Sequence, residues 1–310
     1  MRRAATLIPA VLFAVLALLP FLPLGRDGGY VLGLLTRAMI FGIAALSLDL
    51  MLGAGGLVSF GHAAYLAIGA YAVAVLDANG LSDVWAVLPA ALAAAALFAL
   101  ATGAVALRTR GVNYIMITLA FAQMLYFAAG SLAAYGGDDG YTLGSRTAIF
   151  GARLLETPRG LYAATLALLL ASYLLCRMLV ASGFGRALRG VRQNAVRMQA
   201  MGFDPFALRL AASVTAGVIC ALAGVLLANA AEFVSPAYAA WQRSGDLLIM
   251  VILGGAGSVY GAILGAGAVV LTEEALGRFT EHWRLIYGPL LILAVLFLRG
   301  GLAGGDRHRV

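Results

Sequence analysis

The sequence predicts an all-α polytopic membrane protein, and three observations support this prediction. Hydrophobic residues make up 63% of the 310 residues and charged residues only 11%, against about 25% in a typical soluble domain. Apolar runs of about 20 residues, the length needed to cross a bilayer as a helix, recur along nearly the whole chain. The 39 glycines are typical of membrane helices that pack closely. Residues 1–310 are therefore expected to form a single transmembrane domain.

About ten transmembrane segments are expected, some of them short or broken. Seven apolar runs are bounded by polar or glycine-rich turns, at 7–24, 30–52, 57–76, 85–107, 112–133, 161–181 and 208–231. A long apolar stretch at 244–272 and a last one at 285–299 follow. The glycines and serine of 253–261 are expected to divide the long stretch into two short segments, because a helix can open in a membrane where protein or water satisfies the freed backbone. A re-entrant hairpin that includes 244–256 is the alternative.

The arginines predict the orientation, because basic residues gather in cytoplasmic loops. Five arginines lie between residues 182 and 209, so the loop 182–207 is expected in the cytoplasm. Alternation along the spans then places both termini in the cytoplasm and the polar loops 77–84 and 134–160 outside. The basic, apolar N-terminus is similar to a signal peptide, but no small-x-small cleavage site follows its apolar core. An uncleaved first span is therefore favoured.

The composition excludes several chemistries. All 21 basic residues are arginine, and a P-loop needs a lysine for the phosphates, so the chain is not expected to hydrolyse ATP by that route or to be an enzyme. Cys176 and Cys220 lie in apolar runs and are interpreted as small hydrophobic residues. His62, His282 and His308 are far apart in sequence, so neither a metal nor another cofactor is expected. The arginines flank apolar spans, which explains the net charge of +7 without nucleic acid.

A basic segment, GFGRALRGVRQNAVRMQAMGFDP, interrupts the apolar chain at 183–205. A helix over 186–198 would place its apolar side chains on one face and four arginines on the other. Such a helix could lie on anionic lipid, fix the topology or dock a partner, and the pattern alone favours the first two. The apolar face would hold Leu188, Val191, Ala195 and Met198, and the arginines are Arg186, Arg189, Arg192 and Arg197.

Two glycine-rich patches have a similar pattern in the two halves of the chain. They are GAGGLVSFG at 53–61 and LGGAGSVYG at 253–261, and a helix of small residues follows each. Glycine-interrupted segments in corresponding positions of a transporter indicate the substrate path. Chance likeness within a glycine-rich protein is an equally good explanation, and the residues alone do not decide between the two.

Five blocks of the chain follow one another along the sequence. They are GAGGLVSFGHAAYLAIGAY (53–71), RTRGVNYIMITLAFAQMLY (108–126) together with GGDDG (136–140), the segment 183–205, ILGGAGSVYGAILGA (252–266) and IYGPLLILAVLFLRGGLAG (286–304). In this order and at suitable spacing, they resemble the LivM-type permease subunit of branched-chain amino-acid ABC importers. The run of serine, phenylalanine, glycine and histidine at 59–62 fits this type better than the similar LivH-type subunit. Gln193 and Ala195 depart from the family, which often has acidic residues there.

The resemblance implies an ABC importer permease fold in the lipid bilayer of the bacterial inner membrane. It also implies three kinds of partner: a second homologous permease subunit of the LivH type, two separate ABC ATPase subunits, and a periplasmic substrate-binding protein. Branched-chain or related amino acids are the expected substrate, and urea or another small polar or aromatic carboxylate is the alternative. The loop 182–207 would then be the coupling loop, whose apolar face packs into the ATPase and whose arginines form ion pairs.

Candidate site residues follow from the resemblance and from the glycine patches. The residues expected to couple the chain to the ATPase are Arg186, Leu188, Arg189, Val191, Arg192, Ala195, Met198, Met201 and Gly202. The residues expected on the translocation path are Gly56, Ser59, His62, Gln123, Gly255 and Ser258. Asp138 and Asp139 are expected to contact the binding protein.

Structural roles compete with several of these assignments. His62 begins a helix, where a histidine is more often a structural contact than a proton carrier. Arg37 and Asp49 are expected to pair with neighbouring helices or to reach towards the ends of their span. Gln123 could face the path or bond between helices, and the two aspartates at 138–139 could form a solvated turn.

Two other classes of function are weighed against a permease. An ion-coupled secondary transporter needs Asp, Glu or His inside its spans, and much of the apolar chain contains none of these. A membrane enzyme needs nucleophiles, bases or metal ligands grouped at one depth, and the sequence shows no such group. Both classes are therefore disfavoured. The spans without Asp, Glu or His are 85–107, 112–133, 161–176, 208–231 and 285–298.

Overall fold

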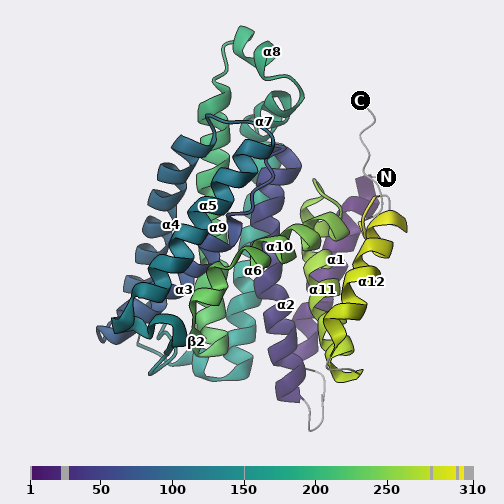
Figure 1. Ribbon diagram of the computed structural model, residues 1–310. Helices are drawn as coiled ribbons and strands as arrows, with labels where there is room; N and C mark the ends of the chain where they lie inside the picture. Colours follow the sequence, from purple (N-terminus) through teal and green to yellow (C-terminus); the bar gives the residue numbers. More distant parts are fainter. Residues whose placement is uncertain (1, 22–27, 150, 280–281, 298–299, 304–310) are drawn as a thin grey trace.

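The computed structural model describes residues 2–21, 28–149, 151–279, 282–297 and 300–303 as an almost entirely helical chain (Figure 1). The α-helices are α1 (Arg2–Leu18), α2 (Gly28–Asp49), α3 (His62–Ala78), α4 (Val84–Ala106), α5 (Val112–Ser131), α6 (Pro158–Ala181), α7 (Gly183–Gln193), α8 (Ala195–Ala200), α9 (Pro205–Ala231), α10 (Trp241–Gly254), α11 (Val259–Phe279) and α12 (Trp283–Phe297). Shorter elements are the turns η1 (Leu19–Phe21), η4 (Ala133–Tyr135), η5 (Gly137–Asp139), η6 (Leu154–Glu156) and η7 (Pro236–Ala239), the π-helical turn η3 (Leu50–Ala54), and the strands β1 (Tyr141–Thr142) and β2 (Phe233–Val234).

The helices confirm the predicted all-α polytopic membrane fold. Six helical segments of the described chain are long and apolar enough to cross a membrane, and α3 is a shorter apolar helix. The last part of the first expected span, 22–24, lies outside the described residues, as do Met1 and 304–310 at the two ends. The cytoplasmic placement of both termini therefore stays a prediction. The six segments are Gly28–Ala54, Val84–Ala106, Val112–Ser131, Pro158–Ala181, Pro205–Ala231 and Val259–Phe279.

The long apolar stretch 244–272 is divided in two, as its glycines predict. α10 ends at Gly254 and α11 begins at Val259. The turn between them contains Gly255 with φ of 106° and Gly257 with φ of 90°, a backbone region that glycine adopts most readily. α10 has only 14 residues, or about 21 Å at 1.5 Å per residue. It is therefore too short to cross a hydrocarbon core of about 30 Å by itself.

The helices α2 and α9 form the centre of the bundle. In their most apolar windows 72% and 67% of the residues are buried, against 22% in α4 and in α5. α9 packs on α2, α3 and α4, and α2 packs on α6 and α11 as well. The peripheral helices present apolar side chains to the surroundings, as a bilayer requires. Leu97, Met124 and Phe127 on α4 and α5 are each more than 60% exposed.

Two glycines allow the most extensive helix contact of the bundle, between α3 and α9. A Cβ atom added at Gly69 of α3 would strike the backbone carbonyl of Ala221, and one added at Gly224 of α9 would strike that of Leu66. Small residues let membrane helices approach until their backbones touch. This contact fixes α3, whose first residue follows one of the two glycine patches, firmly to the centre.

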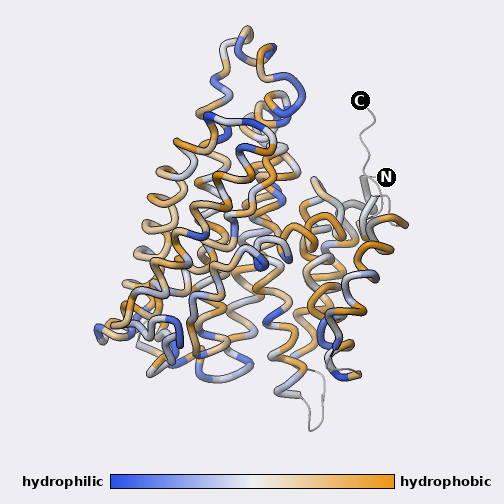
Figure 2. The backbone as a smooth tube through the Cα atoms, in the orientation of Figure 1, coloured by the Kyte–Doolittle hydropathy of each residue, from blue (hydrophilic) through white to orange (hydrophobic). Residues whose placement is uncertain are grey.

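The two polar loops that were expected on the outer face meet at one end of the molecule. β1 and β2 pair there antiparallel, and the carboxylate of Asp77 accepts a hydrogen bond from the amide of Gly144 at 2.8 Å. This end lies opposite α7 and α8 (Figure 1). Hydrophilic residues gather at both ends, and hydrophobic residues dominate the helices between them (Figure 2). Such a pattern is typical of a protein that spans a bilayer.

The glycine contact between α3 and α9 gives a first prediction. Gly224→Ala is expected to lower the free energy of unfolding by about 2 kcal/mol, because the new methyl group must push the two backbones apart. Thermal unfolding in detergent, followed by tryptophan fluorescence, measures this loss. Gly267→Ala on α11 is the matched control, since nothing lies within 4 Å of a Cβ added at Gly267. Equal melting temperatures for the two variants would contradict the packing argument.

Candidate functional site

The basic segment 183–205 forms two short helices rather than one. α7 ends at Gln193, Asn194 has extended torsion angles (φ −155°, ψ 100°), and α8 begins at Ala195. The side-chain oxygen of Asn194 accepts a hydrogen bond from the amide of Arg197 at 2.9 Å, which is how asparagine starts a new helix. The prediction of a single helix over 186–198 is therefore wrong, because Asn194 caps α8 instead of continuing α7.

The apolar face of this segment is buried within the chain itself. Leu188 is fully buried and packs with Ala212 of α9. Val191 and Met198 are also buried and pack with Leu208 of the same helix. The expectation that these side chains pack into a partner is therefore wrong for Leu188, Val191 and Met198. Their burial anchors α7 and α8 to the end of α9.

The tip of the segment is exposed, and we call it the coupling tip: Val196, Arg197, Met201, Gly202 and Phe203. Val196 is 70% exposed, Met201 64% and Phe203 44%. Gly202 forms the turn between the last two with φ of 88°. Met201 and Gly202 are among the expected coupling residues. Val196 and Phe203 are not among them, and Val196 lies off the apolar face of the predicted helix.

The other expected coupling residues lie beside the coupling tip. Arg186 is exposed, and its guanidinium donates a hydrogen bond to the carbonyl of Ala181 at 3.0 Å. Arg189 and Ala195 are half-buried. Their part in binding an ATPase stays a prediction.

Arg192 connects the segment to the first glycine patch. Its guanidinium donates a hydrogen bond to the carbonyl of Gly53, in the turn η3 that follows α2. Its aliphatic stem lies against Gly56, where an added Cβ would come within 2.8 Å of Cγ. Gly56 has φ of 68° and belongs to the unwound stretch between η3 and α3. Arg192 therefore faces inward, towards a broken membrane helix, and not only towards a partner.

The two glycine patches, far apart in sequence, touch each other. A Cβ added at Gly53 would lie 2.6 Å from both the amide nitrogen and the Cα of Gly257. Asp49, only 4% exposed, accepts a hydrogen bond from the amide of Gly257 through Oδ1 at 2.6 Å. This contact favours a common role for the patches over chance likeness. The expected structural pairing of Asp49 is thus a hydrogen bond between the two glycine patches.

A second hydrogen bond joins α3, which follows the first patch, to α10, whose end begins the second patch. The amide of Ala63, at the start of α3, donates to Oγ of Ser244 on α10 at 3.0 Å. His62 is fully buried, and its Nε2 lies 2.7 Å from Oγ of Ser47 on α2. His62 therefore lies in the core at the start of a helix, as its structural interpretation predicts. The structure does not place it on a translocation path.

An apolar groove of about 470 Å³ lies between the two broken segments. Arg192 contributes the charged group at the groove, and the remaining lining is almost entirely aliphatic or aromatic. The groove combines residues that flank both glycine patches, which makes it the candidate path through this part of the chain. Its lining residues are Leu52, Val58, Phe60, Arg192, Gly245, Leu248, Ile249, Ile252 and Ala256.

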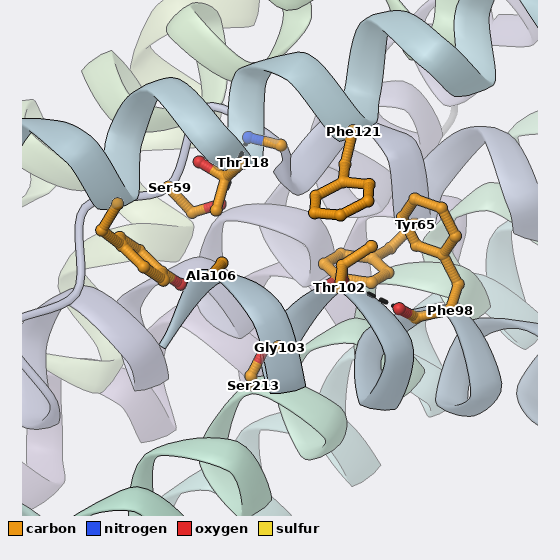
Figure 3. Close-up of a pocket in the computed structure, with 11 residues that line it drawn as sticks. Ser59, Tyr65, Phe98, Thr102, Gly103, Ala106, Thr118, Phe121 and Ser213 are labelled. Atoms are coloured by element: carbon orange, nitrogen blue, oxygen red, sulfur yellow. Dashed lines mark hydrogen bonds between the residues drawn. The ribbon is translucent and has the colours of Figure 1, made fainter. Parts of the chain in front are cut away.

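A much smaller polar cavity lies between α3, α4, α5 and α9 (Figure 3). Its volume of about 10 Å³ is the space of a single water molecule. Hydroxyl groups of Ser59, Thr102, Thr118 and Ser213 line it. Ser59 is buried, and its Oγ accepts a hydrogen bond from the amide of Gly61 at 3.2 Å. This cavity suits a buried water and is too small for an amino acid. Ser59 faces this cavity and is not among the lining residues of the groove.

The remaining candidate residues lie in three places. Gly255 and Ser258 belong to the turn between α10 and α11, beside the groove. Gln123 is half-buried on α5, a helix that packs on α3, α4 and α10. Asp138 and Asp139 are exposed at the end opposite the coupling tip. In the part of the chain that the structure describes, no three His, Cys, Asp or Glu residues gather as metal ligands would.

The bond between Asp49 and Gly257 gives a second prediction. Asp49→Ala is expected to lower the free energy of unfolding by about 2 kcal/mol, because it leaves a buried amide without an acceptor. Asp49→Asn keeps a carbonyl oxygen at the same position and is expected to lose less than half as much. Thermal unfolding of the two variants measures the difference. If both lose the same amount, the hydrogen bond is not what stabilises the contact.

Comparison with known proteins places this geometry in a family. The family described as "Branched-chain amino acid transport system / permease component" matches residues 30–296. The LivM permease protein of the high-affinity branched-chain amino acid transport system of Escherichia coli (strain K12) is 29% identical over 292 residues, which cover 86% of this chain and 68% of that protein. The corresponding LivH permease protein is 24% identical over 290 residues, covering 87% and 92%. No solved structure matches the chain.

These matches agree with the resemblance that the sequence blocks indicate. The family match includes both glycine patches, the groove between them and the basic segment. Salmonella typhimurium has a LivM permease protein that is 27% identical over 290 residues, covering 86% of this chain and 68% of that protein. The chain thus belongs to the family of permease components of branched-chain amino acid transport systems, and it is of the LivM type.

Proposed function

We propose that this chain is a transmembrane permease subunit of an ATP-driven importer and that it translocates branched-chain or related amino acids across the bacterial inner membrane. It works with a second permease subunit of the LivH type, two ABC ATPase subunits and a periplasmic binding protein. The family match over residues 30–296 carries this proposal. The link from an exposed coupling tip to both broken helices supports it.

The energy for transport enters at the coupling tip. The chain contains no lysine for a P-loop, so ATP hydrolysis belongs to another subunit. The tip exposes Val196, Met201 and Phe203 around Arg197. Apolar and aromatic side chains beside an arginine are typical of the centre of a protein–protein contact. An ATPase bound there moves α7 and α8 as one anchored unit.

The hydrogen bonds of Arg192 and Asp49 carry that movement into the membrane. Arg192 joins α7 to the carbonyl of Gly53, and Asp49 joins the same stretch to the amide of Gly257. A shift of α7 therefore displaces the unwound ends of α2 and α10 together. The groove lies between these ends, so the width of the groove changes with the position of the basic segment 183–205.

The lining of the groove favours an amino acid with an aliphatic side chain. Leu248, Ile249 and Ile252 offer an aliphatic surface, and Arg192 offers one positive charge. A carboxylate can pair with a guanidinium while its aliphatic side chain remains on the apolar wall. Urea carries only polar groups and no carboxylate, so this groove fits the alternative substrate less well.

Reconstitution of the complete importer tests the proposal. With ATP on the side of the coupling tip and liganded binding protein on the other, proteoliposomes are expected to accumulate labelled L-leucine. Val196→Asp and Met201→Asp are each expected to reduce both uptake and recovery of the ATPase by about ten-fold or more, because an unpaired carboxylate is costly in a packed contact.

Leu154→Asp is the control for these variants. Leu154 is 55% exposed and lies in η6, in the loop at the end opposite the coupling tip. This variant is expected to leave ATPase recovery unchanged. Uptake by the permease alone, driven by an imposed proton gradient, would refute the importer and support an ion-coupled transporter.

The orientation gives a further prediction. Ser145 and Asn194 are both exposed, the first in the loop that follows β1 and the second between α7 and α8. The strand β2, which pairs with β1, lies at the end of the molecule opposite α7 and α8 (Figure 1). Single cysteines placed there, in a chain without Cys176 and Cys220, are expected to react with an impermeant maleimide from opposite sides of the membrane. Asn194→Cys is expected to react from the cytoplasm and Ser145→Cys from the periplasm. Labelling of both from the periplasm would contradict the orientation.

A further inference from the structure

Three pairs of opposite charge form a line inside the membrane part of the chain. Arg278 and Glu274 lie 3.7 Å apart, Arg37 and Glu273 3.5 Å apart, and Arg243 and Asp246 3.7 Å apart. We call this line the charge ladder. It occupies α2, α10 and α11, three helices that pack on one another. In Figure 2 hydrophilic colour interrupts the hydrophobic body at α2 and α11.

Contacts with aromatic rings of α2 give the depth of the ladder. The guanidinium of Arg278 lies 4.8 Å from the ring centre of Tyr30, near the start of α2. Those of Arg37 and Arg243 lie 5.9 and 5.8 Å from the ring centre of Phe41. Phe41 is the middle residue of the 27-residue segment Gly28–Ala54.

The ladder therefore extends over about half of the membrane. Tyr30 and Phe41 are 11 positions apart, which is about 16 Å along a helix, and the hydrocarbon core is about 30 Å thick. The ladder begins at the end of α2 that is opposite the coupling tip and ends at the level where α10 begins. In the proposed orientation this is the periplasmic half.

The charge of these partly exposed side chains argues that this face does not border hydrocarbon. The side chains of Arg37 and Glu273 are 44% and 15% exposed, and those of Arg243 and Asp246 are 35% and 30% exposed. Charged groups at such depth face a bundle interior or water, since hydrocarbon makes them very costly. The exposed surface of α4 and α5, in contrast, carries leucine, methionine and phenylalanine.

We propose that the charge ladder lines the periplasmic half of the path and binds the backbone groups of a zwitterionic amino acid. At each rung an arginine takes the α-carboxylate and an acidic residue takes the α-ammonium group. Each rung has no net charge, and neither has the substrate, so a step from one rung to the next exchanges partners without separating charge. This inference rests on the proposed importer function and adds a site to it.

Weak binding at each rung suits transport. A conducting site must attract its substrate and still release it. At every rung the arginine and the acid already pair with each other, so the substrate gains its contacts by replacing existing ones. The side chain of the substrate takes no part in these contacts. The ladder therefore recognises amino acids as a class and leaves the choice among them to the binding protein and the apolar groove.

Variants that replace both partners of an ion pair by neutral residues distinguish substrate binding from a purely structural role. Replacing both partners of an ion pair by apolar residues of similar size commonly preserves stability, because no charge is left alone. Arg243→Met with Asp246→Met removes a rung whose two residues lie three positions apart on one helix. If the pair only stabilises the fold, this double variant retains uptake. If it binds the substrate, uptake falls in a folded complex.

The experiment compares initial uptake of labelled L-leucine with ATP hydrolysis in proteoliposomes that hold the complete importer. The double variant is expected to assemble and to keep ATP hydrolysis stimulated by liganded binding protein within about two-fold, while uptake falls about ten-fold with the loss of charge-assisted hydrogen bonds. Arg37→Met with Glu273→Met, a second rung, is expected to give the same result.

Arg153→Met with Glu156→Met is the matched control. This pair has the same spacing of three residues and a distance of 3.1 Å, but it lies in the loop outside the helices. Its neutralisation is expected to leave uptake unchanged. Wild-type uptake in both ladder variants, or an equal loss in the control, would overturn the charge ladder as a substrate site. Absence of ATP-dependent uptake by the unmodified importer would instead overturn the proposed function.

Discussion

The arrangement depends on how two interrupted membrane helices satisfy their backbone. Within a bilayer a free amide or carbonyl has no water to bind, so a break survives only where protein groups replace it. Asp49 accepts the amide of Gly257, and Arg192 donates to the carbonyl of Gly53. The first of these hydrogen bonds connects α2 with the turn between α10 and α11, and the second connects α7 with η3. The contacts that make the breaks stable are therefore the ones that connect them to each other and to α7.

The rest of the bundle combines closely packed helix contacts with less closely packed ones at the two breaks. α9 holds α3 through glycine contacts that leave no room for adjustment, and it anchors α7 through the side chains of Leu188 and Val191. At the two breaks, the stretch after α2 and the stretch after α10 meet through Gly53, Gly257 and the hydrogen bond of Asp49. Packed interfaces resist continuous deformation, so displacement concentrates where side chains are smallest. The groove lies at that place.

Hydropathy and glycine content were sufficient to predict most of the fold from the sequence. The length of an apolar run is a local property, and the break after Gly254 follows from residues inside the run itself. Whether the basic segment forms one helix or two could not be predicted in the same way. Asn194 can sit on a helix face or cap a new helix, and only packing against Leu208 settles which. A proline at Ala195, destructive within one continuous helix, would fall on the first residue of α8, where proline is tolerated.

In the basic segment 183–205, the residues that anchor the segment to α9 differ from the residues that are exposed at the coupling tip. This separation has a consequence for how permeases of this family diversify. The residues that anchor α7 and α8 are buried within the chain, whereas Val196, Met201 and Phe203 contribute little to its own core. Substitutions at the exposed positions therefore have little cost for folding. Under the proposed function, a permease can match a different ATPase through changes at a few surface residues, so gene duplication can produce new pairings while the membrane part stays intact.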